Sequence, residues 1–346
     1  MKKEYQVVGG MAGSSMDGLD LAHITFINEH QEWNFEVTKC QTIAYSDELF
    51  KKLEHAASNE INKQKELDIE FGNWIAAKVK KFNGQNDIDL LAIHGHTVLH
   101  KPEEGISWQL GSGEKIARET GIISVTNFRD EDVKYGGQGA PLVPFGDFIL
   151  FDEYDACLNL GGISNVSIKE LRIAGDICPC NQVLNFYANK LGHDFDEDGG
   201  LAMKGQLDLS FIDKLKSVPY FKKPFPKSLP NKFLPEDLLD SIEPINGLRT
   251  YTEFIASEVA RSLTDTKKGK LLISGGGAYN STLVESIAKK LPYWDIHIPP
   301  KNIISFKEAI IFGFLGLKKF LGEVNVLSTV TGASMDTSSG VIHLPK

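Results

Sequence analysis

Two segments of the chain have the same design, in which a glycine turn joins two short apolar stretches. In the first, Tyr5–Val8 and Leu19–Phe26 flank the stretch Gly9–Gly18; in the second, Gly161-Gly162 lies within Ala156–Ile168. Apolar runs of this length that are rich in β-branched residues predict buried strands. Glycine supplies 32 of the 346 residues, and its clusters indicate places where the backbone comes close to another group.

Helical patterns alternate with further strand patterns in both halves of the chain. Helices are expected at 46–81, 113–120, 181–191, 250–262 and 305–321, and further strands at 89–93, 122–126, 270–274 and 341–344. This alternation predicts an α/β protein, and the length favours two domains. The Gly- and Pro-rich residues 127–147 are expected to form a loop that crosses between domains. We therefore expect one domain at 1–133 plus 325–346 and a second at 134–324.

Charge and cysteine content exclude several classes of protein. The formal net charge is −9 and no basic block occurs, so nucleic acid is not an expected partner. The four cysteines have neither metal-type spacing nor a disulfide framework, and free thiols favour the cytoplasm. The longest apolar run, Ala309–Leu317, is about half a membrane span and contains two glycines. No membrane segment and no secretory leader is expected.

The first glycine turn has the composition of an anion site. The two common phosphate motifs, GxxxxGK[ST] and GxGxxG, are missing. Gly13, Ser14 and Ser15 would instead present backbone N–H groups and hydroxyls in one concavity. Asp17 and Asp20 follow, and carboxylates beside phosphates require a cation, which suggests Mg²⁺ bound largely through water. The alternative is a plain hairpin turn with two surface aspartates.

Two such hairpins and the later turn Gly275–Gly277 together resemble the superfamily of acetate and sugar kinases, actin and heat-shock chaperones. That resemblance implies a two-domain α/β fold of the actin-like (ribonuclease H-like) ATPase type, with a cleft between the domains. In the superfamily the two hairpins clamp the phosphates of ATP, and the late glycine turn lies against the adenosine.

The resemblance becomes specific in short motifs. Gly9–Asp20 resembles the signature G-x-M-S-G-T-S-x-D-G-x-D of the anhydro-N-acetylmuramic acid kinase family, and residues 136–144 read GGQGAPLVP, a rare string of the same family. Other motifs of the family are matched, in order, at 94–97, 128–132, 159–165, 176–181, 195–202, 226–228, 275–280, 308–309 and 331–334. The resemblance covers essentially the whole chain.

The resemblance implies an ATP-dependent sugar kinase of cell-wall recycling. In the family's reaction, water opens the 1,6-anhydro ring of anhydro-N-acetylmuramic acid while the sugar O6 takes the γ-phosphoryl group, which gives N-acetylmuramic acid 6-phosphate. A carboxylate general base must activate the water, and Asp176 occupies the position of that base. The resemblance also implies a small-molecule sugar as partner and a homodimer.

The remaining expected site residues follow from the same resemblance. ATP and its phosphates are expected at Gly13, Ser14, Ser15, Met16, Asp17, Gly18, Leu19, Asp20, Gly161, Gly162, Gly275, Gly276 and Gly277, with Mg²⁺ near Asp17 and Asp20. The sugar is expected at His94, Arg129, Gln138, Asn181 and Glu308. Structural roles stay open beside these: an ion pair of Arg129 with Asp130 or Asp132, a structural His94, a helix-start role for Glu308, and a cap at Asp176.

This chain departs from the family pattern next to the expected base. Cys178 and Cys180 stand where the family motif DTGPGN has glycines, and Ile177 replaces its threonine. If those glycines need positive φ, cysteine there costs about 1 kcal/mol or more each, unless the loop changes shape. Ala12, His96, Ser112 and Tyr279 are further departures; other departures lie at 14 and 230–232. Two alternatives therefore stay open: a kinase of the same fold for another amino or anhydro sugar, and a non-catalytic nucleotide-binding switch.

Overall fold

The computed structural model describes residues 3–13, 16, 18–58, 60–84, 86–230, 233–266 and 268–345. The chain divides into two compact units, one of residues 1–150 and 306–346 and one of residues 151–305. Our sequence analysis set the boundaries at 133/134 and 324/325. The difference arises at two helices: α5 (Val143–Leu150) packs on a strand of the first unit, and most of α11 (Lys301–Phe320) covers that unit's sheet.

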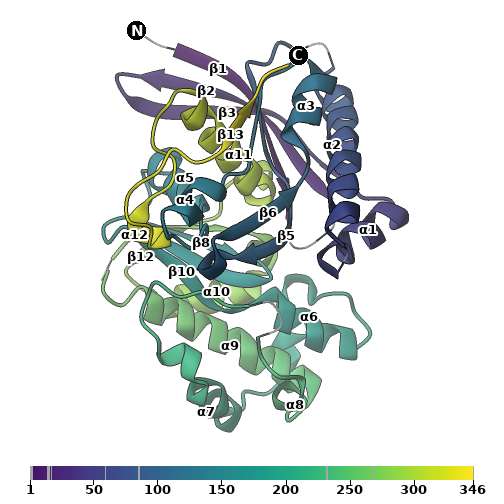
Figure 1. The fold of residues 1–346 in the computed structure, drawn as a ribbon. Helices are drawn as coiled ribbons and strands as arrows, with labels where there is room; N and C mark the ends of the chain where they lie inside the picture. Colours follow the sequence, from purple (N-terminus) through teal and green to yellow (C-terminus); the bar gives the residue numbers. More distant parts are fainter. Residues whose placement is uncertain are drawn as a thin grey trace. The chain divides into compact units, whose positions relative to one another are not determined.

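The first unit is built on a six-stranded sheet with the order β13-β7-β4-β1-β2-β3 (Figure 1). Its strands are β1 (Lys3–Ala12), β2 (Leu19–Glu29), β3 (Glu32–Ile43), β4 (Leu90–His94), β7 (Ser124–Thr126) and β13 (Val341–His343), beside a small hairpin of β5 (His96–Lys101) and β6 (Ile106–Leu110). β1, β2 and β3 form an antiparallel meander, and β4 and β7 add in parallel on the other side of β1.

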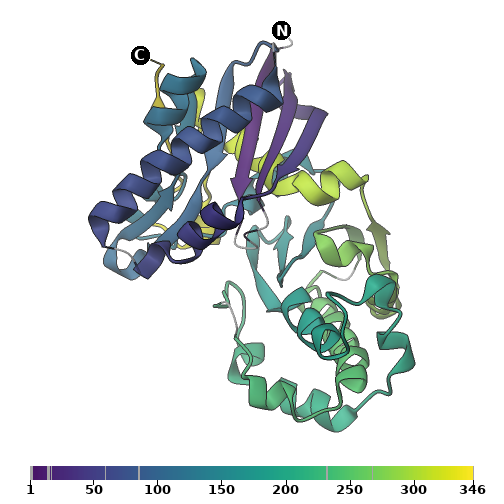
Figure 2. The same ribbon diagram turned by 90° about the vertical axis from the view of Figure 1, so that its right-hand side faces the viewer.

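Helices cover both faces of this sheet. The helices of the first unit are α1 (Asp47–Glu54), α2 (Ile61–Asn83), α3 (Gly113–Thr120), α4 (Asp130–Lys134), α5, α11 and α12 (Ser328–Thr331). α2 and α3 pack on one face, where Val8 and Leu21 share a core with Phe71 and Ile116. Figure 2 shows α2 running alongside the strands. α11 packs on the opposite face, to which Gly9 points.

Gly9 lets α11 approach β1 very closely. A Cβ atom at Gly9 would lie only 2.0 Å from the carbonyl oxygen of Ala309 and 2.9 Å from the backbone nitrogen of Gly313. Gly10 packs toward the side chain of Ile93. Both glycines lie inside β1 rather than in the turn that follows it. Gly9 therefore serves helix–sheet packing and Gly10 packing within the sheet, and both roles differ from that of the turn glycines.

The second unit repeats the same design. Its sheet has the order β10-β9-β8-β11-β12, with strands β8 (Ala156–Leu160), β9 (Ile163–Ile168), β10 (Ile173–Pro179), β11 (Gly269–Ser274) and β12 (Trp294–His297). β8, β9 and β10 form the antiparallel meander, and β11 and β12 add in parallel beyond β8. Because both sheets share this order of a meander followed by two parallel strands, the predicted α/β fold of the actin-like (ribonuclease H-like) type is confirmed.

The helices of the second unit enclose a large apolar core. They are α6 (Asn181–Lys190), α7 (Leu209–Ser217), α8 (Glu236–Leu239), α9 (Pro244–Ser262) and α10 (Ser281–Lys290). Short 3₁₀ turns of this unit are η3 (Glu197–Gly199), η4 (Ala202–Lys204), η5 (Pro219–Lys222) and η6 (Gly276–Tyr279), while η1 (Ala56–Ser58) and η2 (Pro102–Glu104) lie in the first unit. The central helix α9 carries the fully buried Tyr251 and Phe254 into this core.

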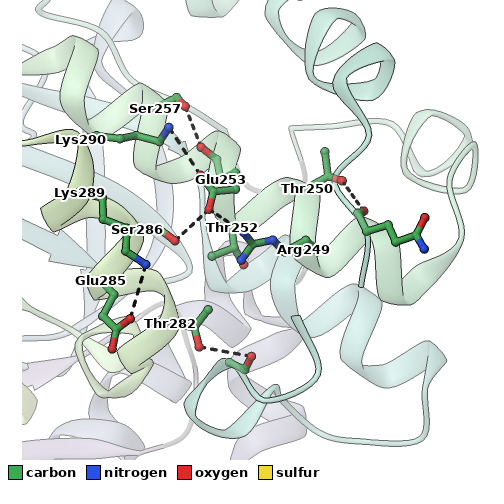
Figure 3. A network of polar contacts seen from close by, with 12 residues as sticks. Arg249, Thr250, Thr252, Glu253, Ser257, Thr282, Glu285, Ser286, Lys289 and Lys290 are labelled. Carbon is green, nitrogen blue, oxygen red and sulfur yellow. Dashed lines mark hydrogen bonds and ion pairs between the residues drawn. The ribbon is translucent and has the colours of Figure 1, made fainter. Parts of the chain in front are cut away.

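A polar network joins α9 to α10 (Figure 3). The carboxylate of Glu253 accepts a hydrogen bond from Ser286 Oγ at 3.1 Å and pairs with Arg249 at 3.3 Å and Lys290 at 3.5 Å. At the start of α10, Thr282 Oγ1 donates to the carbonyl oxygen of Asp198 at 3.0 Å. These contacts hold α10 against α9 and against the segment at Asp198.

Candidate functional site

The turn between β1 and β2 is the first expected phosphate site. Of its residues, Gly13, Met16, Gly18, Leu19 and Asp20 are described, and the amide of Met16 donates to the carbonyl oxygen of Gly13 at 3.3 Å. The expected residues Ser14, Ser15 and Asp17 lie outside the described residues. Asp20 sits opposite Met11 in the β1–β2 register, and its Oδ1 accepts a hydrogen bond from Thr42 Oγ1 at 2.5 Å.

Glu308 belongs to a group of charged side chains in the first unit. It lies in α11, directly after Lys307, whose Nζ forms a buried ion pair with Asp147 of α5 at 2.8 Å. Burial raises the pKa of Glu308, and the charges of Asp20 and Asp147 raise it further, while Lys307 and Arg129 oppose that rise. Because the charge of Asp20 raises the pKa of Glu308, a cation near these two carboxylates would favour the ionised form of Glu308.

His94 and Arg129 contact each other directly. His94 ends β4 and is buried, and its Nε2 accepts a hydrogen bond from Arg129 Nε at 3.1 Å. Because Nε2 is an acceptor, the ring is neutral with its proton on Nδ1. Burial, followed by the charge of Arg129, holds the pKa of His94 well below its usual value. This favours a structural or orienting role over base catalysis.

Arg129 also donates from Nη1 to the carbonyl oxygen of Gly139 at 2.5 Å. Burial lowers its pKa to about 10, and the charge of Glu308 opposes that effect. Among the ion pairs of the described residues there is none between Arg129 and Asp130 or Asp132, so the loop ion pair that we left open is wrong. The guanidinium group of Arg129 instead bonds to His94 and to the carbonyl oxygen of Gly139, and it experiences the charge of Glu308.

In the second unit, the glycine turn after β11 lies against the β8–β9 hairpin. Gly275 has φ +81°, and a Cβ there would lie 2.4 Å from Asn159 Oδ1. Asn181, at the start of α6, donates from Nδ2 to the carbonyl oxygen of Leu160 at 2.9 Å, and its own amide donates to that of Gly161 at 3.1 Å. The expected residues Gly161, Gly162 and Gly275–Gly277 therefore converge on one place with Asn181.

A pocket of about 720 Å³ opens beside this turn. Its volume lies within the usual range of small-ligand pockets. Its wall includes Gly276, Gly277 and Asn181, together with the exposed rings of Phe195 and Tyr279. Asn181, which we assigned to the sugar, lines this pocket. The pocket therefore fits the nucleoside expected next to the late glycine turn.

Asp176, the expected base, lies in β10 and is partly buried. Its Oδ2 accepts a hydrogen bond from the amide of Leu229 at 2.8 Å, and its backbone is held by Lys227 and Tyr220. Burial raises the pKa of Asp176, while the Leu229 amide and the charge of Lys227 lower it. The side chain is not a helix cap, because α6 begins five residues later and Cys180 occupies the position before it.

The two cysteines beside Asp176 are accommodated without left-handed backbone. Cys180 has φ −121° and ψ −99°, and Cys178 continues β10 past a bulge at Asp176. Neither residue is among those with positive φ. Both are fully buried in the core of the second unit, where burial raises the pKa of each thiol. The loop therefore needs no left-handed residue at either position, and both side chains fill space in the core.

Several residues at these places escaped the sequence analysis. Lys307 and Asp147 form a buried pair, and Tyr220 and Leu229 support Asp176. Lys227 also supports Asp176, but it lies in the motif matched at 226–228. Lys307 stands next to Glu308 at the start of an apolar helix, and this position could have predicted a buried ion pair. The contacts of Asp176 join residues that lie 44 and 53 positions away in the chain, so no local pattern announces them.

In the part of the chain that the structure describes, there is neither a cluster of metal-ligating side chains nor a helix that could span a membrane. No group of three or more His, Cys, Asp or Glu side chains is arranged there to hold a metal ion. A site for Mg²⁺ that is ligated mainly by water and phosphate oxygens needs only one or two carboxylates. Asp20, whose charge acts on Glu308, stays the described candidate for such a carboxylate. Within the same residues, no helix is both long and apolar enough to span a bilayer.

Comparison with known proteins gives one family. The family model described as anhydro-N-acetylmuramic acid kinase matches residues 5–345. A relative with that name from Caldanaerobacter subterraneus subsp. tengcongensis is 31% identical and covers 99% of this chain and 98% of its own. A second relative with the same name, from Shewanella sp. (strain ANA-3), is 32% identical with 98% coverage of both chains. Among solved structures, a glucokinase of the ROK family from Streptomyces griseus in complex with glucose and AMPPNP is 12% identical, with a TM-score of 0.44 over 90% of this chain and 99% of its own.

Proposed function

The chain belongs to the anhydro-N-acetylmuramic acid kinase family, and we propose that it carries out the reaction of that name. In the proposed reaction the enzyme uses ATP and water to convert anhydro-N-acetylmuramic acid into N-acetylmuramic acid 6-phosphate. Water forms a bond to the anomeric carbon, the bond from that carbon to O6 breaks, and O6 takes the γ-phosphoryl group of ATP. ADP leaves, and one proton of the water passes to a base.

Asp176 is the base in this proposal. Its Oδ2 is engaged by the amide of Leu229, so Oδ1 is the atom we assign to accept the proton of the attacking water. The raised pKa of the carboxyl group makes the ionised form a stronger base than an exposed aspartate. Lys227 and Tyr220 act as positioning residues, because they hold the backbone on either side of the carboxylate.

The sugar binds, in this proposal, through Arg129, Gln138, His94 and Glu308. Arg129 is a cation held by His94 and the Gly139 carbonyl group, and it suits the carboxylate of a muramic acid. Glu308, with its raised pKa, suits a hydrogen bond to a sugar hydroxyl. Asn181 is proposed to order the glycine turn of the nucleotide pocket, since its side chain is bonded to Leu160.

Phosphates of ATP are proposed to bind at the β1–β2 turn and at Gly161-Gly162, with the nucleoside in the pocket beside Gly275–Gly277. Mg²⁺, when bound, supplies charge neutralisation for the transferred phosphoryl group. Asp20 would hold it through water, with Glu308 near by. We further propose a cytoplasmic homodimer; the described cysteines are all free thiols, as a reducing compartment requires.

The observation that carries this proposal is the family match over residues 5–345. The test is a coupled ADP-release assay with anhydro-N-acetylmuramic acid, together with detection of the 6-phosphate product by mass spectrometry. We expect turnover with this sugar, and loss of turnover but retained nucleotide binding in Asp176→Asn. A folded, ATP-binding protein that turns over another amino or anhydro sugar far faster would contradict the substrate, and one that turns over no sugar would contradict the function.

A further inference from the structure

Asp132 is a fully buried carboxylate for which the proposed reaction has no use. It lies in α4, and both of its oxygens are engaged: Oδ1 accepts a hydrogen bond from Thr331 Oγ1 at 2.6 Å and Oδ2 accepts one from the amide of Gly139 at 2.7 Å. Thr331, also buried, is the last residue of α12 and is 199 residues away in sequence. A charged acceptor makes both hydrogen bonds strong.

The loop Gly136–Gly139 is held between these two partners. The amide of Gln138 donates to the carbonyl oxygen of Thr331 at 2.8 Å, and that of Gly137 donates to the carbonyl oxygen of Asp132 at 2.9 Å. A Cβ at Gly137 would lie 2.2 Å from Asp132 Oδ2, so the loop packs directly on the carboxylate. The backbone of Gln138 is therefore fixed, while its side chain is left exposed.

The far side of the same loop holds Arg129. The carbonyl oxygen of Gly139 accepts from Arg129 Nη1, and Arg129 Nε donates to His94. A continuous set of hydrogen bonds thus runs from Thr331 through Asp132 and Gly139 to Arg129. Every member belongs to the first unit.

We infer that Asp132 and Thr331 are positioning residues that set the affinity for the sugar substrate. Their hydrogen bonds fix the conformation of the Gly136–Gly139 loop, and this holds Gln138 and Arg129 in the geometry in which they bind the sugar. This inference rests on the proposed function, because it takes Arg129 and Gln138 as sugar contacts. It gives a role to the family motifs at 128–132 and 331–334, which meet in one hydrogen bond.

Thr331→Val is the sharpest variant, because valine has nearly the shape of threonine and lacks only the hydroxyl. Loss of a hydrogen bond to a buried charged group costs a free energy that corresponds to about a 10- to 100-fold change in an equilibrium constant. We expect the KM for the sugar to rise at least tenfold, while the KM for ATP stays within about twofold of the wild type. Thr331→Ser restores the hydroxyl and is expected to restore the sugar KM.

Asp132 provides the second pair of variants. Asp132→Asn keeps both contacts, since its oxygen accepts from Gly139 and its amide donates to Thr331 Oγ1; its sugar KM is expected within about threefold of the wild type. Asp132→Ala is expected to behave as Thr331→Val does. The matched control is Thr252→Val in α9 (Figure 3), a fully buried threonine whose hydroxyl donates to the carbonyl oxygen of Leu248.

Hydrogen exchange at residues 137–139 supplies a readout that needs no turnover. We expect these amides to exchange at least tenfold faster in Thr331→Val than in the wild type, in Thr331→Ser and in Thr252→Val. If Thr331→Val lowers the melting temperature but leaves both the sugar KM and this exchange unchanged, the two residues are merely structural and the inference is overturned. If the wild type turns over no sugar, the proposed function fails. The exchange result still decides whether Asp132 and Thr331 fix the conformation of residues 137–139.

Discussion

The carboxyl group of Asp176 experiences two opposing influences. Burial disfavours its ionised form, while the amide of Leu229 and the charge of Lys227 favour it. The Nζ atom of Lys227 lies 4.5 Å from the ring centre of Tyr220, and burial lowers the pKa of this lysine. The balance between these influences sets the pH at which Asp176 is available as a base.

We predict that Lys227→Met moves the acidic limb of the pH profile of kcat/KM to higher pH. A general base works only when it is ionised, and activity is lost as the pH falls through its pKa. Removal of a cation that lowers this pKa raises it, so the limb moves upward. The measurement is kcat/KM for the sugar against pH.

Lys223→Met is the control for that shift. Lys223 is an exposed lysine of the same segment and is not among the groups that influence Asp176. Its profile is expected to coincide with that of the wild type. A downward or absent shift in Lys227→Met would show that Asp176 is not the group that titrates in the acidic limb.

Single residues were predictable to different degrees. Asp176 and Glu308 were singled out because they stand in recognisable motifs, and the hydroxyl-rich turn was singled out from its composition; their roles stay predictions. Gly9 was grouped with the turn glycines, because sequence alone does not distinguish a glycine that admits a helix from one that admits a phosphate. The backbone of Cys178 and Cys180 was likewise not predictable, since a bulge in β10 decides it.

At the scale of elements, α11 contacts both the sheet of the first unit and α5. Its face toward the first sheet is made of small residues and packed rings: Gly9 admits the carbonyl oxygen of Ala309, and Phe314 lies 5.4 Å from Phe26. Its start carries Lys307, whose ammonium group pairs with Asp147 of α5. Both side chains of this pair are at most 4% exposed, so neither charge is solvated by bulk water.

We predict that Lys307→Met lowers the free energy of unfolding by about 3–5 kcal/mol, because it leaves the carboxylate of Asp147 buried without its cation. The double variant Lys307→Met/Asp147→Leu is expected to regain most of that loss, since an apolar pair of similar size needs no solvation. Urea unfolding monitored by circular dichroism measures both variants.

The matched control for the pair is Lys289→Met, which removes one partner of the exposed ion pair with Glu285 on α10 (Figure 3). Exposed pairs contribute little, so its unfolding curve should overlay that of the wild type. If Lys307→Met and Lys289→Met cost the same, the buried pair has no special role in holding α11 to α5.

Strands and helices were predictable where their pattern was strong. The central strands β1, β2, β4, β8 and β11 and the long helices were expected from apolar runs and helical periodicity. β3, β10 and β12 were missed because they lie at or next to sheet edges and their apolar signal is short or interrupted. Residues 127–147 were expected to be a loop, yet they contain α4 and the first part of α5. Their glycines and prolines obscured the pattern of these two short helices.

At the scale of the whole molecule, the residues proposed for the reaction are divided between the two units. Asp20, His94, Arg129 and Glu308 belong to the first unit, and Asp176 belongs to the second with the nucleotide pocket. The chain passes between the units twice, at 150/151 and within α11 at 305/306. The proposed reaction requires both sets of residues to act on the same pair of substrates.

We predict that the two units approach each other when ATP and the sugar are both bound, because a kinase must exclude water from the transferred phosphoryl group, while in the proposed reaction one water molecule reacts at the anomeric carbon. Small-angle X-ray scattering of Asp176→Asn, which binds without turnover, should show a smaller radius of gyration with both ligands than with either alone. Asp176→Asn/Thr331→Val, at a sugar concentration that saturates only the single variant, should stay expanded. A radius that does not change when both ligands are saturating would mean that the units are already in their reactive arrangement, and closure would then play no part in the reaction.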